Sequence, residues 1–552
     1  MRLSAYSLRS FCLLPVVFVF LLLPNGISAQ NVYLDSTTTV VNSSNAPVSG
    51  GDTIFLQSGT YEFLLFKGIR GDSQQAVTIT NDKGEVIIDS DHYFGISFQN
   101  CRHIHLSGQT KYGIRITKVE NGGGIGISAL SSHFEIDRVE IANTLHAGIM
   151  CKTDPDCSYK ATRDSFLMKD IHIHDNYIHH TGTEGLYIGS SNFFGNILKC
   201  EGKDTLLLPH LIEGVHIHGN IIKYTGWDGL QVSSAIDNCA IYNNRILYDS
   251  QAEQNFQMSG ILSGSGSDCD CYNNLIAYGK GNGIEFHGTG GQRFFNNLII
   301  HAGQQYKPGD PKHPRHGMVF NHQVFLSPDS SIRVFNNTII KPKSDGIRFN
   351  LSDYQSAENF VQNNIIVSPG AFDYYENLNT FRTGQDAYVF QKDTGLDVTV
   401  SDNIFTLDPA FPQFLDTLAD NYTLRPGSPA IDQGTDLSAH GILFDYYYTA
   451  RPQGPAFDIG AFEFDSLTVG QKESAREHHG VFPNPASDFF MLKTTGPHHI
   501  RVFSPSGNLL LQKKNAAPGE RISIRQLKPG LYFLQLQHTS SHAVNTLKLI
   551  IL

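Results

Sequence analysis

The segment Asn273-Asn274-Leu275-Ile276 and, 23 residues later, Asn296-Asn297-Leu298-Ile299 are two copies of the motif that decides the fold. Each copy places an asparagine pair before a short apolar run. Related copies are His218-Gly219-Asn220-Ile221, Asn243-Asn244-Arg245-Ile246, Asn336-Asn337-Thr338-Ile339, Asn363-Asn364-Ile365-Ile366 and an earlier Asp175-Asn176-Tyr177-Ile178. The second asparagines follow one another at 44, 24, 30, 23, 40 and 27 residues. Self-similarity with a unit of about two dozen residues predicts a solenoid with loops inserted into some copies.

Each copy contains a second predicted strand, which opens with a glycine. Examples are Gly185-Leu186-Tyr187-Ile188, Gly229-Leu230-Gln231-Val232 and Gly283-Ile284-Glu285-Phe286. Alternation of period two over four or five residues is typical of strands, and the 3.6-residue period of long helices is missing. Each coil should therefore contain two or three short strands around a core of Ile, Val, Leu and Phe.

The recurring asparagine is expected at a bend, where its side-chain amide can bond the equivalent residue one coil away, because buried amides need such partners. With these motifs, residues 50 to 405 resemble the right-handed parallel β-helix proteins. The resemblance implies an all-β fold, a right-handed parallel β-helix solenoid. It does not define an activity, because one fold hosts many functions.

The charge balance limits the class of partner. Lys plus Arg number 41 and Asp plus Glu 52, so the net charge is −11. Nucleic acids and anionic membranes bind basic surfaces, so the negative net charge argues against both as partners. An acidic polysaccharide remains compatible, since a local basic groove can lie on an acidic protein. We expect a monomer.

The first 29 residues are typical of a secretory signal. Arg2 and Arg9 precede an apolar run from Phe11 to Pro24, and small residues precede Gln30. The apolar run is short for a membrane span, and no later segment has 18 uncharged apolar residues. We expect an exported protein whose mature chain has no transmembrane helix.

Export makes disulfides plausible. Cys151 and Cys157 enclose a five-residue loop, so we expect a disulfide between them. Cys239 and Cys269 each lie five residues before the second asparagine of their coil, which places them on neighbouring coils. With Cys271 they are either small core residues or a bridge between coils.

The C-terminal region has a different character. The motifs Asn421-Tyr422-Thr423-Leu424 and Asp458-Ile459-Gly460-Ala461 resemble the closing segment of extracellular β-helix proteins, which implies a cap on the open end. Residues from Val481, with Phe482-Pro483-Asn484-Pro485 and Leu527-Lys528-Pro529-Gly530, resemble the C-terminal sorting domain of the type IX secretion system. This implies a small β-sandwich that engages the type IX machinery, and a bacterial protein that crosses the outer membrane to be secreted or held at the cell surface. The expected domains are a signal peptide (1–29), a β-helix with its cap (30–465), a linker (466–480) and a sorting domain (481–552).

Two carboxylates lie in matching positions before the glycine of the second strand. Thr181-Gly182-Thr183-Glu184-Gly185 aligns with Thr225-Gly226-Trp227-Asp228-Gly229, so Glu184 and Asp228 should lie on adjacent coils, about 4.8 Å apart in the backbone. Repulsion between such carboxylates raises one pKa, which suits a general acid beside a general base or nucleophile. Alternatively, both accept hydrogen bonds from turn amides beside the glycine. Trp227 can stack on a sugar ring or anchor its loop.

The strand before the asparagine bend carries a histidine patch. Ile171-His172-Ile173-His174 aligns with Val215-His216-Ile217-His218, which places four imidazoles on one outer face. A flat sheet without carboxylates converges poorly on a metal, so a sugar-contacting face is the preferred interpretation. Tyr242, Tyr272, Phe295 and Phe335 continue the column as an aromatic strip that suits a long, flat glycan.

These residues suggest a secreted, carbohydrate-active protein that cleaves a polysaccharide by hydrolysis or β-elimination. Glu184 and Asp228 are the candidate catalytic residues, and His174, His218, Trp227 and Glu285 are the candidate substrate contacts. β-Helix lyases often use Ca²⁺, for which Asp268 and Asp270 are possible ligands, while no cofactor is required by any motif. The alternative is a non-catalytic glycan-binding or adhesion protein of the cell surface.

Overall fold

Two compact units make up the chain, Met1–Asp465 and Ser466–Leu552. The computed structural model describes residues 29–109, 112–321, 330–351, 358–370, 382–464, 480–482, 486, 489–493, 496–503, 509–527, 530–538 and 544–551. The expected signal peptide, apart from Ala29, and the expected linker, apart from Gly480, lie outside the described residues.

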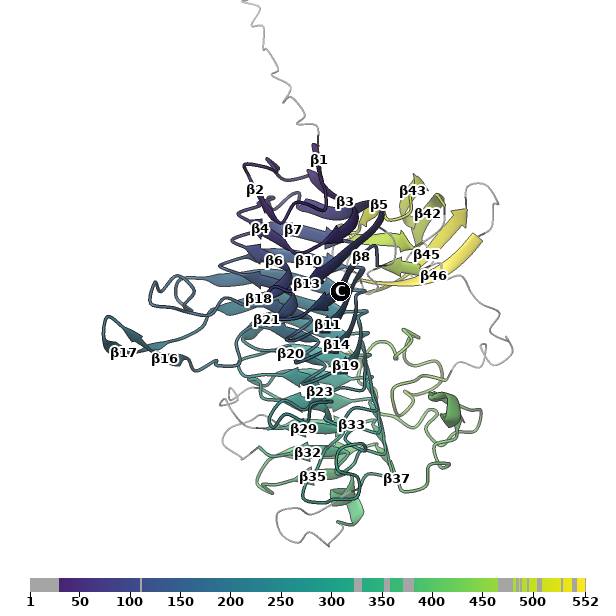
Figure 1. Cartoon of the computed structure of the whole chain (residues 1–552). Helices are drawn as coiled ribbons and strands as arrows, with labels where there is room; N and C mark the ends of the chain where they lie inside the picture. Colours follow the sequence, from purple (N-terminus) through teal and green to yellow (C-terminus); the bar gives the residue numbers. More distant parts are fainter. Residues whose placement is uncertain are drawn as a thin grey trace, which may run out of the picture. The chain divides into compact units, whose positions relative to one another are not determined.

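The first unit is a right-handed parallel β-helix built from a 23-stranded sheet A and a 12-stranded sheet B (Figure 1). One column of sheet A contains β1 (Asn31–Leu34), β3 (Thr53–Tyr61), β5 (Val77–Ser90), β7 (Arg102–Ser107), β10 (Ser132–Asp137), β13 (Leu167–His174), β18 (Leu211–His218), β21 (Ala235–Tyr242), β24 (Cys269–Tyr272), β27 (Arg293–Phe295), β30 (Arg333–Phe335), β33 (Asn359–Gln362) and β36 (Val398–Ser401). The second column of sheet A, after the bend, contains β8 (Ile114–Val119), β11 (Val139–Thr144), β14 (Tyr177–Thr181), β19 (Ile221–Thr225), β22 (Arg245–Leu247), β25 (Leu275–Ala277), β28 (Leu298–Ile300), β31 (Thr338–Ile340), β34 (Ile365–Val367) and β37 (Ile404–Thr406). Sheet B contains β2 (Val40–Asn42), β4 (Leu64–Lys67), β6 (Phe94–Gln99), β9 (Gly123–Ser128), β12 (Ile149–Cys151), β15 (Leu186–Ile188), β20 (Leu230–Val232), β23 (Ser259–Ser263), β26 (Asn282–Phe286), β29 (Met318–Phe320), β32 (Ile347–Phe349) and β35 (Val389–Gln391).

The asparagine motif forms a continuous ladder at the bend between the two columns of sheet A. Each side-chain amide donates to the side-chain oxygen of the next asparagine at 2.9–3.1 Å, through Asn176, Asn220, Asn244, Asn274, Asn297, Asn337, Asn364 and Asn403. Asn403 extends the ladder by one coil beyond the copies recognised in the sequence. The residue before each ladder asparagine has a positive φ, 54° at Asn273 and 65° at Gly219, which explains why this position holds only Asn, Asp or Gly.

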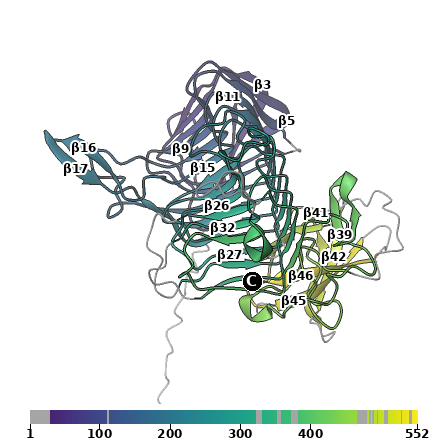
Figure 2. The same cartoon turned by 90° about the horizontal axis from the view of Figure 1, so that it is seen from below.

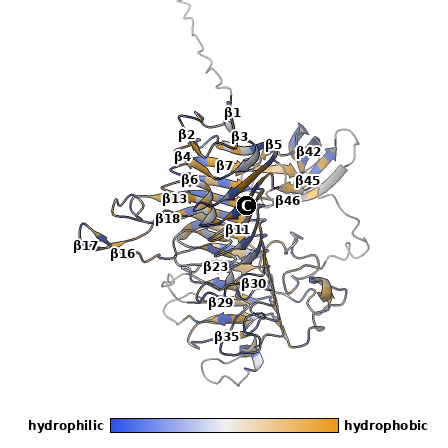
Figure 3. Cartoon of the chain, viewed as in Figure 1, coloured by the Kyte–Doolittle hydropathy of each residue, from blue (hydrophilic) through white to orange (hydrophobic). Residues whose placement is uncertain are grey.

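The core follows from alternation along the strands. Hydrophobic and hydrophilic residues alternate along the coils (Figure 3), and the inward-facing Ile, Val, Leu and Phe form one continuous buried cluster. Aromatic rings stack from coil to coil within it, as Phe320 does on Phe349 with 4.9 Å between ring centroids. Burial of this apolar surface is the main stabilising term of the solenoid.

The segment that resembles a closing cap lies along the side of the coils. It includes β38 (Phe414–Asp416), η2 (Thr417–Ala419), β39 (Asn421–Leu424) and η3 (Ser438–His440). The positive-φ asparagines of alternate coils bond it: Asn243 donates to the Tyr448 hydroxyl at 2.6 Å, and Asn296 donates to the Phe444 carbonyl at 2.7 Å. Asn363 donates to the Thr435 carbonyl at 2.8 Å. The expectation of a segment that only closes the open end was therefore incomplete, because its hydrogen bonds run laterally.

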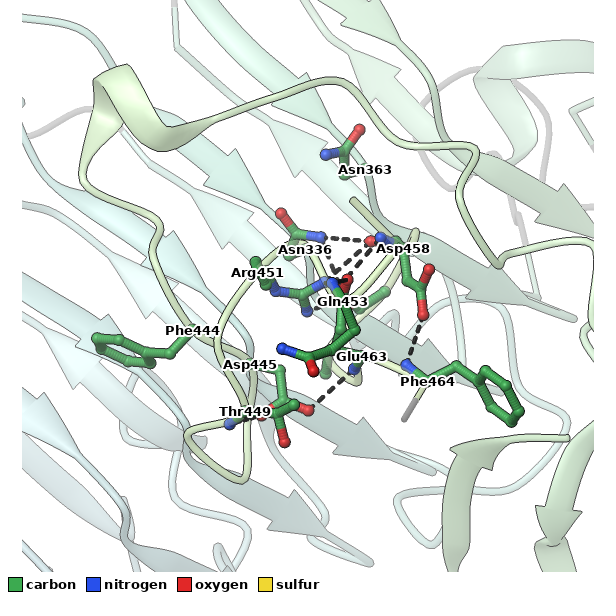
Figure 4. A network of polar contacts seen from close by, with 12 residues as sticks. Asn336, Asn363, Phe444, Asp445, Thr449, Arg451, Gln453, Asp458, Glu463 and Phe464 are labelled. Carbon is green, nitrogen blue, oxygen red and sulfur yellow. Dashed lines mark hydrogen bonds and ion pairs between the residues drawn. The ribbon is translucent and has the colours of Figure 1, made fainter. Parts of the chain in front are cut away.

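A buried charge pair anchors this segment (Figure 4). Arg451 donates to Glu463 at 2.6 Å and to the carbonyls of Asp458 and Gly460 at 3.0 and 2.7 Å. Asn336 of the β-helix donates to the same two carbonyls at 2.9 and 3.2 Å. Outward-facing apolar residues of β28, β31 and β34 pack against the segment as well. The contacts give the segment a fixed position on the coils.

The expected disulfide between Cys151 and Cys157 was wrong. Cys157 is bonded to Cys200, at the end of β16 (Asn196–Cys200), which forms a hairpin with β17 (Lys203–Leu207). Cys151 ends β12, where its side chain points into the core and contacts the Met168 sulfur at 3.4 Å. Strand alternation thus turns Cys151 away from the loop. Cys239 and Cys269 form a bridge between neighbouring coils, and Cys271 is a buried free thiol.

The second unit contains two antiparallel sheets around one core. One sheet has β40 (Gly480–Phe482), β41 (Phe489–Lys493) and β44 (Arg521–Ser523), and the other has β42 (His498–Phe503), β43 (Leu509–Ala516), β45 (Gly530–His538) and β46 (Val544–Ile551). Phe490, Ile500, Leu534 and Leu549 lie in the shared core. This is the expected small β-sandwich. In the part of the chain that the structure describes, no helix is long and apolar enough to cross a membrane.

Candidate functional site on the outer face of sheet B

Insertions border sheet B on both of its edges. Residues 152–166 and 189–210 follow the sheet B strands β12 and β15, and residues 301–317 precede β29. The hairpin β16–β17 within the second insertion projects away from the coils (Figures 1 and 2). A loop of residues 249–258 folds over the turn before β20, where Ser250 and Ala252 donate to the carbonyls of Trp227 and Gly226 at 2.9 and 2.8 Å. In a solenoid, loops of this kind commonly form the binding side.

The glycine that opens each sheet B strand fixes the position of the residue before it. A Cβ on Gly185 would lie 2.5 Å from the Gly229 carbonyl of the next coil, so only glycine allows this approach. Leu186 pairs with Leu230, and Gly185 donates to the Asp228 carbonyl at 3.2 Å. Glu184 and Asp228 therefore occupy equivalent positions on adjacent coils, as the aligned motifs predict. Ser259, Asn282, His316 and Asp345 continue the column.

Asp228 has no polar partner for its carboxyl group. Its side chain is fully buried, and neither carboxyl oxygen makes a hydrogen bond within the described residues. Burial raises the pKa of Asp228 well above its ordinary value, and the negative charges of Glu285 and Glu184 raise it further. Burial also raises the pKa of Glu184, which is 3% exposed. Asp228 therefore favours its protonated form more strongly than an ordinary aspartic acid does.

Glu285 is the opposite case, an ionised carboxylate with four donors. Ser259 and Asn282 donate to Oε2 at 2.8 and 2.9 Å, and Asn321 donates to Oε1 at 2.8 Å. His287 Nε2 lies 2.8 Å from Oε1. Burial alone would raise the pKa of Glu285, but hydrogen bonding and the charge of His287, with the Ser259 and Asn282 hydrogen bonds, lower it to about 2. Asp228 and Glu285, whose pKa values are shifted in opposite directions, therefore lie on the same face of sheet B.

Other buried polar atoms near this pair also lack partners. Among the described residues these are Gln231 Oε1, Gln257 Oε1, Ser263 Oγ and Asp249 Oδ2. They lie on the same coils as Asp228 or in the loop that covers it. Burial raises the pKa of Asp249 to about 6. Buried polar atoms are normally satisfied, so a group of unsatisfied ones indicates a place where water or a polar ligand binds.

A charged network continues the column toward β32. His316 Nδ1 lies 3.1 Å from Asp345 Oδ2, and Arg348 donates to the same oxygen at 3.0 Å. Arg382 is ion-paired with Asp345. Burial, followed by the charge of Arg348, lowers the pKa of His316 well below its ordinary value. Arg348 and Arg382 thus balance the charge of the buried Asp345 at this end of the column.

Trp227 lies at the turn directly before Asp228 and is partly exposed. Its backbone N–H donates to the Thr183 carbonyl of the preceding coil at 3.1 Å. The backbone of this turn is therefore held between the preceding coil and the loop of residues 249–258, and Trp227 is the residue next to Asp228 in the turn.

His174 and His218 lie on the other sheet. Their strands pair as aligned, His172 with His216 and His174 with His218. The His174 and His218 rings stack with 4.7 Å between centroids, and Tyr242, Tyr272 and Phe295 continue the stack. Burial lowers the pKa of His218 well below its ordinary value, whereas hydrogen bonds to Asp175 and Glu135 outweigh burial and raise the pKa of His174 to about 9.

The aromatic strip is therefore not an open glycan surface, and this expectation was wrong. Tyr242, Tyr272 and Phe295 are 8%, 7% and 3% exposed. Phe444 of the lateral segment packs against Tyr272 and Phe295, and His440 packs against Phe335. Sequence alternation identified the outward face correctly but could not show that another segment covers it.

The possible calcium ligands, Asp268 and Asp270, lie near arginine side chains. Asp270 accepts from the Arg293 backbone at 2.9 Å and is ion-paired with its guanidinium. Arg293, Arg333, Ala439, His440 and Gly441 line a cavity of about 390 Å³ between sheet A and the lateral segment. Burial raises the pKa of Asp268 to about 6. Asp270 is therefore committed to an arginine.

Sequence reasoning missed most partners of Glu285. The stretch Asn282-Gly283-Ile284-Glu285-Phe286-His287 alternates polar and apolar residues, and this pattern places Glu285 and His287 on one outer face. Asn321 has no such signal, because it lies 36 residues beyond Glu285 and its approach depends on coil stacking.

Comparisons with known proteins agree with the fold. The family described as "Right handed beta helix region" matches residues 211–406, and "Secretion system C-terminal sorting domain" matches residues 480–552. No curated protein matches the chain. The chain is similar to the crystal structure of pectate lyase Pel9A, at 14% identity and a TM-score of 0.43, covering 80% of this chain and 98% of that one. It is also similar to alginate lyase from Paenibacillus sp. str. FPU-7, at 16% identity and a TM-score of 0.33, covering 59% and 99%.

These structural likenesses are too distant to define chemistry. The stacked coils, the asparagine ladder and the two matched regions define the architecture and the export route. The chain is a right-handed parallel β-helix protein with a C-terminal sorting domain of the type IX secretion system, which directs it to the cell surface or the extracellular space.

Proposed function

We propose that this exported protein hydrolyses a glycosidic bond of a polysaccharide on the outer face of sheet B. The observation that carries the proposal is the contrast between Asp228 and Glu285. Asp228 is a buried carboxyl group with a raised pKa and no hydrogen-bond partner among the described residues, whereas Glu285 is an ionised carboxylate with four donors. Glycosidases use such a pair, one carboxylic acid to protonate the leaving oxygen and one carboxylate that acts as base or nucleophile. Asp228 is the proposed acid.

Glu285 is the proposed ionised partner. Its four donors hold the carboxylate in one orientation and keep it charged, which stabilises positive charge that develops on the sugar. Its negative charge also contributes to the raised pKa of Asp228. Glu184, on the preceding coil, adds to this effect and remains a second candidate acid. Trp227, beside Asp228, is the proposed stacking platform for a sugar ring.

The test compares the exported protein with Asp228→Asn and Glu285→Gln on neutral and uronate-containing polysaccharides from plants, algae and animals. Hydrolysis predicts new reducing ends without the ultraviolet absorbance of an unsaturated uronic acid. Loss of the general acid should lower kcat by about a hundredfold or more. Because Glu285→Gln keeps the shape but removes the charge, it should also lower kcat, measured at a temperature well below the reduced unfolding midpoint that loss of the charged hydrogen bonds gives this variant.

The matched control is Glu85→Gln, a carboxyl-to-amide change at an exposed residue on β5 of sheet A, which leaves both carboxyl groups of the site. Unsaturated products would instead indicate β-elimination. Glycan binding that survives both carboxyl substitutions, with no product from any bound glycan, would refute hydrolysis and favour the non-catalytic surface-binding alternative.

A further inference from the structure

Three successive strands of sheet A gather two imidazoles and two carboxylates into one cluster. His105 on β7 pairs with Glu135 on β10, and Asp137 on β10 pairs with His174 on β13. All four side chains lie on the outer face of the sheet. The histidine patch alone was expected to be flat and without carboxylates. The acidic residues come from the strand Phe134-Glu135-Ile136-Asp137, whose alternation matches Ile171-His172-Ile173-His174 but which precedes the first asparagine copy.

Donor atoms of His105, Glu135 and Asp137 all lie within 4.8 Å of one another, and His174 lies against the two carboxylates. His105 Nε2 lies 3.5 Å from Asp137 Oδ2 and 3.9 Å from Glu135 Oε1. His174 Nε2 lies 3.2 Å from Glu135 Oε1 and 3.9 Å from Asp137 Oδ2. Four ligands at about 2.1 Å from an ion in tetrahedral geometry lie about 3.4 Å from one another. The nitrogen–oxygen distances of the cluster are therefore close to those of a bound shell.

Neighbouring side chains orient two of these donors. Asp175 Oδ2 lies 3.1 Å from His174 Nδ1, which directs the other ring nitrogen, Nε2, toward Glu135 and Asp137. Arg138 donates to Asp137 Oδ1 at 3.3 Å, so Oδ2 faces the cluster. In metal sites, the ring nitrogen of a histidine that does not bind the ion usually forms a hydrogen bond with a group such as a carboxylate.

The cluster is partly exposed on one side, so an ion can reach it from solvent. The side chains of His174 and Asp137 are 5% and 9% exposed, whereas those of His105 and Glu135 are 22% and 25% exposed. His105 Nε2 is itself buried and makes no hydrogen bond within the described residues. This buried imidazole nitrogen is directed at two carboxylates. Without a hydrogen bond it is either an N–H group that lacks an acceptor or a metal ligand that lacks its ion.

We propose that His105, Glu135, Asp137 and His174 bind one divalent transition-metal ion. Two imidazoles and two carboxylates suit Zn²⁺, whereas Ca²⁺ and Mg²⁺ prefer shells made only of oxygen. Since the protein supplies all four ligands, the ion is structural and joins three successive coils. The site lies on sheet A and is independent of the carboxyl pair on sheet B, so it stands whether or not the protein hydrolyses a glycan.

The experiment uses the full exported chain, stripped with EDTA, dialysed and titrated with ZnSO₄. We expect one equivalent of Zn²⁺ per chain by elemental analysis, and a raised unfolding midpoint on Zn²⁺ addition. Co²⁺ in place of Zn²⁺ should give the intense visible bands of tetrahedral coordination. His105→Ala and Glu135→Gln should each abolish stoichiometric binding, and Asp175→Asn should weaken the affinity by about tenfold to a hundredfold.

His216→Ala is the matched control, because it removes an imidazole from the same face of sheet A, two coils from Glu135, and leaves all four ligands. It should retain one equivalent and the Co²⁺ bands. Substoichiometric binding by the parent protein, or equal losses in His216→Ala and Glu135→Gln, would overturn the proposal. Far-ultraviolet circular dichroism of the metal-free variants checks that each still folds, and Asp137→Asn replaces any variant that does not.

Discussion

Replacement of one ladder asparagine should show how much this column stabilises the β-helix. Asn274 is fully buried, and its side chain makes four hydrogen bonds. It accepts from the backbone and side-chain N–H groups of Asn244, both at 3.1 Å. It donates to the Ile241 carbonyl at 2.8 Å and to Asn297 Oδ1 at 3.0 Å. In Asn274→Ala, Asn297 Oδ1 keeps the Asn274 backbone N–H as a donor.

Three buried groups then lose a partner: two N–H groups of Asn244 and the Ile241 carbonyl. Each unsatisfied group costs about 1–3 kcal/mol, so the free energy of unfolding should fall by about 3–9 kcal/mol. Chemical denaturation followed by circular dichroism measures the loss. Hydrogen exchange should show reduced protection in the coils from β21 to β28, because each coil of a solenoid depends on its neighbours.

The matched control is Asn121→Ala, whose exposed side chain makes one hydrogen bond, to the Asp91 carbonyl at 2.7 Å. We expect this change to cost less than about 1 kcal/mol. If Asn274→Ala is no more destabilising than Asn121→Ala, the ladder does not stabilise the stack and the reasoning fails.

Two further predictions concern charged groups. Because the pKa of Glu285 is lowered from 4.5 to about 2 in the folded state, its ionised form stabilises the fold by about 3 kcal/mol above pH about 4.5, and this is lost as the pH falls toward about 2. Glu285→Gln should flatten that part of the stability curve, and parallel curves for the two proteins would contradict it. Arg451→Met leaves the fully buried Glu463 without its partner, which should destabilise the lateral segment by about 3–5 kcal/mol and speed proteolysis between residues 430 and 464. Adding Glu463→Gln should slow that proteolysis again; equal rates in the single and double variants would show that the pair does not hold the segment.

The register between coils was predictable because each residue of a solenoid contacts the equivalent residue on the next coil. Aligning the glycine and asparagine motifs was enough to place Leu186 beside Leu230 and Asn244 beside Asn274. A missed repeat has a simple cause. The coil with Glu135 and Asp137 has Val139 where later coils have the ladder asparagine, and Arg138 at the positive-φ position before it, so the asparagine motif could not identify this coil and its two carboxylates.

Contacts made outside the repeat were not predictable in the same way. Sequence distance suggested a bond from Cys151 to Cys157, whereas the strand direction of β12 and the path of the hairpin insertion bring Cys200 to Cys157. The partner of Asp228 was expected to be Glu184 on the adjacent coil. Glu285 contributes more to its raised pKa, because a long side chain can lean across a coil boundary toward Ser259.

The sequence by itself determined the winding, the ladder, the export route and the outward direction of each strand residue, because period and alternation are properties of local chain geometry. Only the tertiary structure decided which outward residues remain accessible. The lateral segment covers the aromatic strip through apolar packing and the Arg451–Glu463 pair, and no periodic rule governs where such a segment returns. The same applies to the polar face of sheet B, where burial and hydrogen-bond donors, rather than residue type, shift the pKa values of Asp228 and Glu285 in opposite directions.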